Sequence, residues 1–577
     1  MASENPWWKN ATIYQVYPAS FKDDNGDGIG DLPGILSKLD YIKSLGVDAI
    51  WICPMYDSPQ YDMGYDISNY EAVYPPYGTV ADVEAIIAGC HERGLRVLLD
   101  LVINHTSHLH AWFIESRSSK TSAKRDWYVW RPAKYDTDGT RRPPNNWRSM
   151  FGGSAWEWDE ETQEYYLHLF AVQQPDLNWE NPNTREAIYE SAMEFWLRKG
   201  IDGFRVDTVN MYSKEQSFGD APIVDPRLEW QPAPSLYCNG PRIHEFLRRM
   251  GEILGKYNAM TVGELPNTPQ VEHVLRYVSA KEKQLSMVFQ FDIMDVGTGN
   301  LRFNTTPRNW TLSDFRERVA RTQELLNGTD GWSTSFLENH DQARSISRFG
   351  SEETPELWQR SAKMLSMLLA SLSGTLYLYQ GQEIGMVNMP ADWDISEYKD
   401  LDSLNYYKFI QEVSRNDSTA VREAKLSLAH LARDHARIPM QWDGTPNAGF
   451  TSQSAKSWMR VHDNYPLLNV KRQQHDSTSV FNFWREMLRV RRENPNVFAH
   501  GIYSDPEPTK ENVFVFEKTA DTQKLVVALN FTADDQTLDQ LAGYIGAASV
   551  KALIRNYDDE PLNLLRPFEG RIYLVEK

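Results

Sequence analysis

Short apolar, β-rich runs alternate with longer amphipathic segments along most of the chain, which is typical of βα units and a parallel sheet. Eight runs are predicted strands: Thr12–Tyr17, Asp48–Ile52, Arg96–Val102, Gly203–Asp207, Met260–Glu264, Met287–Asp292, Trp332–Glu338 and Thr375–Gln380. Apolar residues at three- and four-residue spacing predict helices between them, among them Val80–Arg93, Thr184–Lys199, Ile243–Tyr257, Leu312–Leu326 and Pro355–Leu372. The pattern indicates an α/β fold, a (β/α)8 TIM barrel whose chemistry lies at the carboxyl ends of the strands.

Two gaps between predicted elements are too long for simple loops, at His105–Asn181 and Gly385–Ser479. The first indicates a loop-rich inserted domain after strand three. After Asn496 the helical pattern gives way to four β-rich runs: Val513–Glu517, Leu525–Phe531, Val550–Asn556 and Arg571–Val575. We therefore expect four parts: barrel 1–105, inserted domain 106–180, barrel 181–496 with an insertion at 385–478, and an antiparallel β domain at 497–577.

The net charge of −19 opposes broad attraction to nucleic acid or anionic lipid. No run approaches the roughly 20 apolar residues that span a bilayer, and Met1–Asn10 has no signal-peptide pattern. Three cysteines cannot all pair, which favours a reducing compartment. We expect a cytoplasmic protein without nucleic acid, membrane or obligate protein partners.

Polar residues gather at the predicted strand ends: Asp100, Asn104, His105, Arg205, Asp207, Glu264, His340 and Asp341. One such carboxylate alone is as well explained by capping the next helix. Four around one rim favour a shared site, because converging carboxylates split their pKa values into one ionised nucleophile and one protonated acid, as glycoside hydrolysis needs. A divalent metal site is the competing interpretation, but no HxH or HExxH spacing supports it.

Five segments in this order along the barrel carry a family resemblance: Asp100–His105 (DLVINH), Gln174–Trp179 (QPDLNW), Gly203–Asp207 (GFRVD), Val262–Glu264 (VGE) and Phe336–Asp341 (FLENHD). Together they resemble the α-amylase superfamily, glycoside hydrolase family 13. QPDLNW and Ala436–Trp442 (ARIPMQW) are similar to its oligo-1,6-glucosidase and maltase branch. The resemblance covers essentially the whole chain.

The resemblance implies that Asp207 is the nucleophile, Glu264 the general acid/base and Asp341 the carboxylate that stabilises the transition state. Arg205, on the same face of the strand as Asp207, is expected to keep that carboxylate ionised and so to lower its pKa. Glu264 has to stay protonated near neutral pH, which requires burial or a nearby anion. A retaining mechanism places the two carboxyl groups about 5 to 5.5 Å apart.

The same resemblance implies a pocket for the terminal, non-reducing glucose. Its expected residues are Asp62, Tyr65, His105, Phe170, Gln174, Arg205, Thr208, His340 and Arg433. A closed sugar pocket limits cleavage to chain ends, which makes the enzyme exo-acting.

A second constellation lies in the loop Asp23–Asp31. Oxygen donors fall at positions one, three, five and nine (Asp23, Asn25, Asp27 and Asp31), with the carbonyl of Ile29 at seven and glycine at six. This pattern predicts a structural Ca²⁺ site, with Mg²⁺ as the alternative occupant because the twelfth-position glutamate of an EF-hand is missing. An acidic, glycine-rich turn without an ion is the competing interpretation.

We therefore expect a retaining α-glucosidase that acts on maltose, short malto-oligosaccharides and, as a further candidate, sucrose. The resemblance implies that threonine or alanine after the nucleophile favours α-1,4 bonds and valine favours α-1,6 bonds, so Thr208 indicates a maltase. The alternatives are an oligo-1,6-glucosidase and a transglucosylating relative such as a sucrose isomerase, although the RLDRD motif of sucrose isomerases is missing. A catalytically dead relative is disfavoured because the chain keeps its catalytic carboxylates and has no membrane span.

Overall fold

The computed structural model describes residues 6–298, 309–538, 541–545, 549–558 and 563–576. Eight parallel strands form its central sheet, in the order β13-β12-β11-β5-β2-β1-β15-β14. They are β1 (Thr12–Val16), β2 (Ala49–Ile52), β5 (Arg96–Leu101), β11 (Gly203–Val206), β12 (Met260–Glu264), β13 (Met287–Phe289), β14 (Thr334–Ser335) and β15 (Thr375–Tyr379). A parallel bridge between Val288 and Ser333 joins the two edge strands and closes the barrel. The predicted (β/α)8 fold is confirmed, with all eight strands in their expected places.

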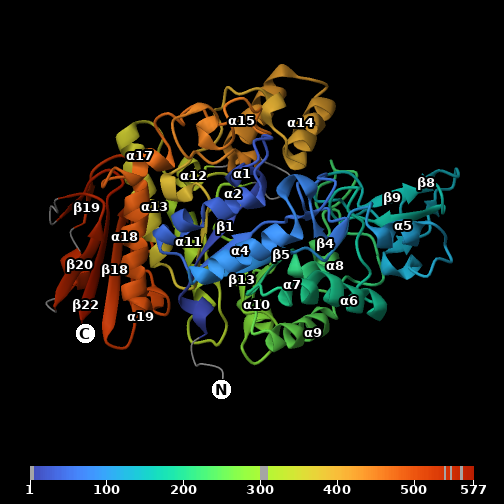
Figure 1. Ribbon diagram of the computed structural model, residues 1–577, viewed down its shortest axis with the longest axis horizontal. Coiled ribbons are helices and arrows are strands. Elements are labelled where there is room, and N and C mark those ends of the chain that lie inside the picture. Colours follow the sequence, from blue (N-terminus) through green and yellow to red (C-terminus); the bar gives the residue numbers. More distant parts are fainter. Residues whose placement is uncertain (1–5, 299–308, 539–540, 546–548, 559–562, 577) are drawn as a thin grey trace.

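Helices surround this barrel in the centre of the molecule (Figure 1). The main ones are α2 (Leu32–Ser37), α3 (Leu39–Leu45), α4 (Val80–Glu92), α6 (Pro182–Ile188), α9 (Ile243–Lys256), α10 (Val271–Val278), α11 (Leu312–Glu324), α12 (Ser345–Phe349), α13 (Pro355–Ser371) and α18 (Val480–Glu493). Two of them start where a capping residue precedes proline: Asn181 accepts from the Asn183 N–H before α6, and Thr354 accepts from the Leu357 N–H before α13. Strands such as β2 and β15 are buried at every position, because helices cover one face and the barrel interior the other.

Three predicted elements differ from the structure. Strand β14 covers only Thr334–Ser335 of the expected Trp332–Glu338, because the chain leaves the sheet after Ser335 and carries Asp341 to the pocket described below and His340 to a position behind its wall. Strand β13 ends at Phe289, three residues early. The helix expected at Thr184–Lys199 is interrupted by a π-helical segment at Tyr189–Glu194 and resumes as α7 (Phe195–Leu197).

The first insertion leaves the barrel after β5 and extends to the right-hand side of Figure 1. It contains α5 (Ala111–Arg117) and a three-stranded antiparallel sheet of β6 (Trp130–Arg131), β10 (Glu164–Leu167) and β9 (Trp156–Asp159). The hairpin of β7 (Lys134–Tyr135) and β8 (Arg141–Arg142) extends from it. An antiparallel bridge between His105 and Asp176 joins the two ends of the insertion. His105 and Gln174, far apart in sequence, are thereby brought together.

The second insertion follows β15 and carries three helices: α14 (Leu401–Val413), α15 (Ser418–Leu431) and α16 (Asp434–Arg437). Figure 1 shows α14 and α15 above the barrel. The Asn405 side chain donates to the Phe151 carbonyl at 3.0 Å, which ties α14 to the first insertion. Residues of both insertions, among them Phe170 and Arg433, line the pocket described below.

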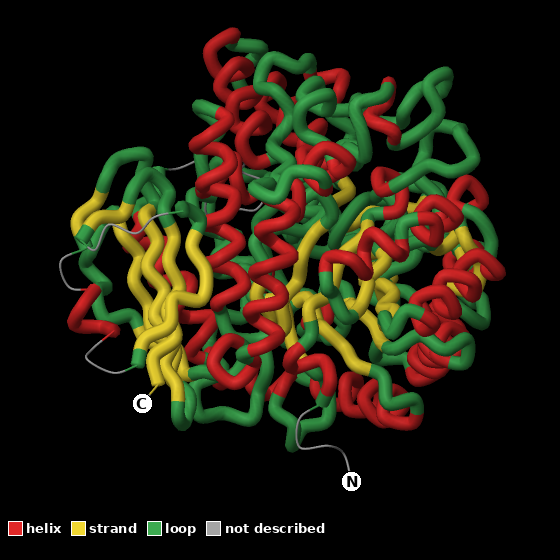
Figure 2. The backbone as a smooth tube through the Cα atoms, turned by 60° about the vertical axis from the view of Figure 1, so that its left-hand side comes forward, coloured by secondary structure: helices red, strands yellow, loops and turns green. Residues whose placement is uncertain are grey.

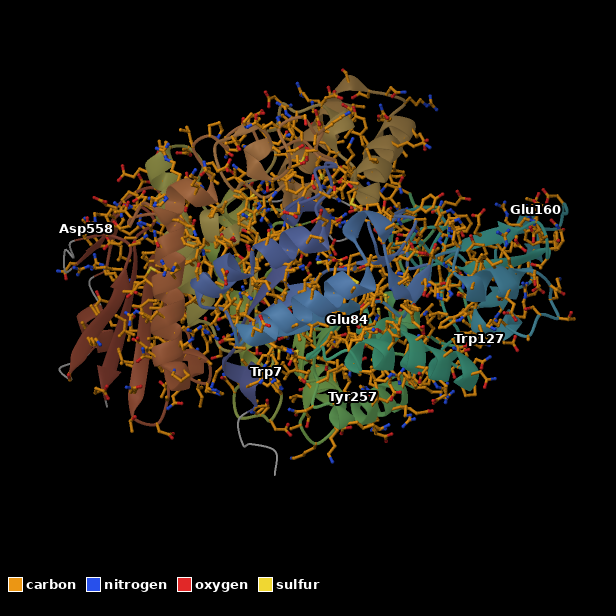
Figure 3. All side chains as sticks on the ribbon, in the orientation of Figure 1. Trp7, Glu84, Trp127, Glu160, Tyr257 and Asp558 are labelled. Atoms are coloured by element: carbon orange, nitrogen blue, oxygen red, sulfur yellow. The ribbon has the colours of Figure 1, made fainter. Side chains whose placement is uncertain are left out.

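The carboxyl-terminal part is an antiparallel five-stranded sheet, which confirms the predicted β domain. Its strands are β16 (Ile502–Ser504), β17 (Val513–Thr519), β18 (Gln523–Asn530), β22 (Gly570–Glu576) and β20 (Val550–Arg555), in that spatial order. Figure 2 shows this sheet beside long helices of the barrel, and α13 contacts both β18 and β22. Figure 3 places Glu160 of the inserted domain and Asp558 of the β domain at opposite ends of the molecule. The exact residues that bound the four parts stay a prediction.

The cysteines Cys53, Cys90 and Cys238 are free and buried, as expected. Within the described residues, no helix is both long enough and apolar enough to span a membrane.

Candidate active site

A pocket lies at the carboxyl ends of the barrel strands. Its lining residues are Asp62, Tyr65, His105, Met150, Phe151, Phe170, Asp207, Thr208, Glu264, Asp341, Asp402 and Arg433. The three predicted catalytic carboxylates are all among them, together with six of the nine predicted sugar-binding residues. The other three, Gln174, Arg205 and His340, are buried directly behind the wall and bond to residues that line it.

The centre of the site is Arg205, whose guanidinium is shared among three carboxylates. One terminal nitrogen donates to Asp100 and to Asp207, each at 2.7 Å, and the other lies 2.9 Å from Glu264. All four side chains are almost completely buried. A single positive charge therefore faces up to three negative charges where water cannot screen them.

This sharing overturns the expected pKa of Asp207. We predicted that Arg205 would lower it, but burial and the neighbouring Glu264 and Asp100 raise the pKa of Asp207 well above its ordinary value. Burial likewise raises the pKa of Asp100 to about 6. The prediction was wrong because it treated Asp207 as the only carboxylate that Arg205 binds. One guanidinium cannot keep three buried carboxyl groups ionised. In the free protein the three carboxyl groups together therefore retain a proton near neutral pH.

Thr208 follows Asp207 in a left-handed conformation, with φ of 38° and ψ of 46°. Its backbone N–H donates to Oε2 of Glu264 at 3.1 Å, and its hydroxyl donates to Oδ2 of Asp207 at 3.2 Å. A β-branched residue rarely adopts this conformation, which costs free energy. Thr208 thus contacts both members of the predicted catalytic pair.

His340 is held by a chain of hydrogen bonds that fixes its tautomer. The Gln15 amide nitrogen lies 2.9 Å from Nδ1, and amide nitrogen can only donate, so Nδ1 accepts. Nε2 therefore carries the hydrogen and donates to the Tyr65 hydroxyl at 2.6 Å, which donates in turn to Asp100 at 3.2 Å. Burial lowers the pKa of His340 to about 3, so the ring is neutral and its 3.5 Å contact with Asp341 is not an ion pair.

His105, Gln174 and Phe170 form the opposite wall. The His105 ring lies against Phe170 with centroids 4.9 Å apart, and its Nε2 lies 3.1 Å from the Tyr65 carbonyl. Burial lowers the pKa of His105 to about 4. The Gln174 amide donates to Asp62 at 2.9 Å. Burial also raises the pKa of Asp62 to about 7, so near neutral pH this carboxyl group can both donate and accept hydrogen bonds.

A second charged cluster holds Asp341. Arg433 and Arg437 donate to the same oxygen of Asp341, at 3.0 and 2.8 Å. Both arginines also bind the buried Asp400, at 2.8 and 2.5 Å. Arg433 reaches Asp62 as well, at 3.5 Å. Two guanidinium groups therefore fix Asp341 in place.

Several residues of this site escaped the sequence analysis: Gln15, Met150, Phe151, Asp400, Asp402 and Arg437. Arg437 lies inside the ARIPMQW motif, so a signal for it existed. Asp400 resembles an ordinary capping residue, and its side chain does cap α14 by accepting from the Asp402 N–H. Gln15 sits in an apolar strand with no local sign of a partner 325 residues away.

The predicted metal loop is well ordered by its own hydrogen bonds. Asp23 accepts from the N–H groups of Gly26 and Gly28, and Asp31 accepts from those of Asp24, Asn25 and Gly34. In the described part of the chain, no three or more His, Cys, Asp or Glu side chains are grouped so as to hold a metal ion. Here the carboxylates face backbone N–H groups instead of a common centre. Calcium binding stays a prediction.

The fold and pocket together define a carbohydrate-active type of site: paired carboxylates, neutral histidines and an aromatic wall at the strand ends of a (β/α)8 barrel. Residues 15–501 match the family model "Alpha amylase, catalytic domain". The chain belongs to the α-amylase family, as the resemblance implied.

Curated relatives match over nearly the full length. An α-glucosidase of Candida albicans is 49% identical, with 100% of both chains covered. An oligo-1,6-glucosidase of Saccharomyces cerevisiae is 48% identical, covering 100% of this chain and 98% of the relative. Among solved structures, the trehalose-6-phosphate hydrolase of Bacillus licheniformis is 38% identical with a TM-score of 0.90, covering 99% and 100%. The isomaltulose synthase of Protaminobacter rubrum is 36% identical with a TM-score of 0.91, covering 100% of both.

The neutral, buried His340 makes stability depend on pH in a defined direction. An unfolded histidine takes up a proton below its ordinary pKa of 6.5, whereas His340 in the fold resists protonation down to about 3. Between these values the unfolded state binds more protons, so stability is lost as pH falls. As the pH falls from 7 to 4.5, we predict that the free energy of unfolding decreases by roughly 2 kcal/mol less in His340→Gln than in the wild type.

Thermal midpoints measured across this pH range check the prediction. His475→Gln is the matched control, because His475 is exposed, and it should follow the wild type. Parallel pH profiles for the wild type and His340→Gln would contradict a buried neutral ring.

Proposed function

We propose that this enzyme is a retaining, exo-acting α-glucosidase that removes terminal non-reducing glucose from maltose, short malto-oligosaccharides and sucrose. The observation that carries the proposal is the pairing of Asp207 and Glu264 on one guanidinium, in a pocket that Asp341 also lines. Arg205 contacts both carboxyl groups, at 2.7 and 2.9 Å, and Thr208 donates a hydrogen bond to each. Inverting enzymes need a gap that holds a water molecule between their carboxyl groups, so this close pairing favours retention.

The residues divide the work in two steps. Asp207 attacks the anomeric carbon while Glu264 donates its proton to the glycosidic oxygen, and the bond to the departing sugar breaks as the glucosyl ester forms. Glu264, now ionised, takes a proton from water, which attacks the same carbon and releases glucose and the Asp207 carboxylate. Asp341, fixed by Arg433 and Arg437, stabilises the positive charge that develops on the sugar ring.

The shape and chemistry of the pocket support cleavage at chain ends. Asp62, Tyr65, His105 and Arg433 line it together with the catalytic carboxylates. These groups supply donors and acceptors for the hydroxyls of one sugar ring, and Phe170 supplies an apolar surface. A wider cleft shares Met150, Asp341, Asp402 and Arg433 with the pocket and leaves room for the departing sugar.

Thr208 supports a preference for α-1,4 over α-1,6 bonds. Relatives named α-glucosidase and relatives named oligo-1,6-glucosidase are all 45 to 49% identical to this chain, so overall identity does not decide the linkage. Thr208 is a wall residue of the pocket with a hydroxyl where valine has a methyl group. An α-1,6-glucosidase is the alternative function. We further propose that the enzyme works in the cytoplasm, since its cysteines are all free, and that it needs no obligate protein partner.

The catalytic assignment predicts a sharp difference between two amide variants. Asp207→Asn should lower kcat on maltose by roughly 10⁴-fold or more, because an amide cannot form the glucosyl ester. Glu264→Gln should lose activity on maltose but keep much of it on aryl glucosides, whose leaving groups barely need a proton. Steady-state kinetics on both substrates measures this, with circular dichroism to verify folding. Near-normal turnover by Asp207→Asn, or equal losses on both substrates for Glu264→Gln, would overturn the roles.

The linkage assignment predicts that the wild type cleaves maltose better than isomaltose. Thr208→Val should lower the ratio of kcat/KM for maltose to that for isomaltose by about tenfold, because the Thr208 hydroxyl, whose hydrogen is donated to Asp207, still accepts a hydrogen bond from substrate, and such a pairing discriminates strongly. The matched control is Thr121→Val, at an exposed threonine of the inserted domain. A wild type that cleaves isomaltose but not maltose would contradict the assignment.

We also propose that the loop Asp23–Asp31 holds a structural Ca²⁺, with Mg²⁺ as the alternative. The support is its donor set, three carboxylates, one amide and one carbonyl at the spacing of a calcium loop. Binding requires the carboxylates to turn from backbone N–H groups toward the ion.

Chelation should then lower the thermal midpoint without directly removing a catalytic group, and added Ca²⁺ should restore it. Asp27→Ala, which removes an exposed carboxylate of the loop, should abolish this response, whereas Asp138→Ala in the inserted domain should keep it. A thermal midpoint that is unchanged by both chelator and Ca²⁺ would leave the loop as an ordinary acidic turn.

A further inference from the structure

Thr208 combines a strained backbone with bonds to both carboxylates of the predicted catalytic pair. Its φ of 38° is unusual for a β-branched side chain, and its side chain is only 4% exposed. Strained residues at active sites persist where the surrounding structure holds them. Here the Met211 N–H donates to the Thr208 carbonyl at 2.9 Å, and the Tyr212 hydroxyl donates to the Asp207 carbonyl at 2.8 Å, so the turn is fixed from both sides.

The left-handed turn aims the two donors of Thr208 at different carboxylates. The N–H meets Oε2 of Glu264 and the hydroxyl meets Oδ2 of Asp207. Arg205 reaches the same Oε2 of Glu264 and the other oxygen, Oδ1, of Asp207. In an extended or right-handed Thr208 the N–H and the side chain would stand at a different angle to each other, because φ sets the rotation between the N–H and the Cα–Cβ bond, and the two donors would not meet both carboxylates together.

These bonds distinguish the two oxygens of Glu264. Oε2 accepts from the Thr208 N–H and lies 2.9 Å from the positively charged Arg205 guanidinium, and an oxygen in these surroundings is a poor place for a proton. When Glu264 is protonated, its proton therefore sits on Oε1. This is the oxygen that remains to reach the glycosidic oxygen of a substrate.

We propose that Thr208 is a positioning residue for catalysis, whose left-handed backbone reserves Oε2 of Glu264 as an acceptor and so assigns the acid proton to Oε1, while its hydroxyl orients Asp207. This role rests on the proposed function and is separate from linkage preference. It acts on kcat for every substrate, whereas linkage preference changes only the ratio between substrates.

A series of four variants separates backbone from hydroxyl. Thr208→Gly and Thr208→Ala both lack the hydroxyl, but only glycine adopts φ near +38° without strain. Thr208→Gly should therefore have a higher thermal midpoint than Thr208→Ala. At the control position 88, on the exposed side of helix α4, Ala88→Gly should have a lower thermal midpoint than the wild type with its alanine, since glycine destabilises a helix. If Thr208→Gly has a lower thermal midpoint than Thr208→Ala, the left-handed conformation of Thr208 is wrong.

The hydroxyl is tested by kinetics on maltose and on an aryl glucoside. Thr208→Val and Thr208→Ala should lower kcat about tenfold on both substrates with a smaller change in KM, and Thr208→Ser should recover most of the loss. The acid limb of the kcat/KM profile should move to higher pH in the valine and alanine variants, because a lost donor raises the pKa of the carboxylate that it served. Valine or alanine variants with wild-type kcat and pH profile would refute the role.

Asp207→Asn in the same assay distinguishes a failure of the Thr208 role from a failure of the proposed function. An inactive Asp207→Asn beside unaffected Thr208 variants would sink this inference and leave the proposed function intact. Wild-type turnover by Asp207→Asn would instead remove the proposed function itself.

Discussion

A single buried guanidinium serving three carboxylates is the constraint around which the site is built. Arg205 reaches Asp100, Asp207 and Glu264 at 2.7 to 2.9 Å, and the strands that carry them, β5, β11 and β12, are neighbours in the barrel. Parallel strands in register bring these side chains to one edge. The resulting shortage of positive charge keeps a proton among the three carboxyl groups. That is the state an acid and nucleophile pair needs before substrate arrives.

The other residues of the pocket shield this charged centre from water. The first insertion brings Phe170 and Gln174 against His105, and the bridge between His105 and Asp176 fixes that contact. The second insertion brings Arg433 and Arg437 to Asp341. Because both insertions lie over the strand ends, residues from distant parts of the chain surround a volume suited to a sugar ring. Buried histidines with lowered pKa values stay neutral there and leave the carboxylates as the titrating groups.

Much of this arrangement was predictable from the sequence, because local signals were strong. Continuous apolar runs predicted all eight barrel strands, and apolar residues at three- and four-residue spacing predicted helices that the structure confirms as α4, α9, α11 and α13. The motif residues converge in one pocket. Long-range charge relations were not predictable in the same way. The sequence shows Arg205 two residues from Asp207 but does not show that Asp100 and Glu264 compete for it, so the pKa of Asp207 was predicted in the wrong direction. Gln15, Asp400 and the left-handed turn at Thr208 likewise depend on packing between distant segments.

The central claim is that Asp207 and Glu264, held together by Arg205, act as a close pair that retains the configuration of the sugar. Proton NMR of a maltose reaction, recorded in the first minutes before mutarotation, identifies the anomer of the glucose released from the non-reducing end. The reducing-end glucose is distinguished by isotopic labelling. The close pairing predicts that this glucose appears first as the α-anomer, through two successive displacements at the anomeric carbon. Initial release of the β-anomer would mean a single displacement by water and would contradict the account.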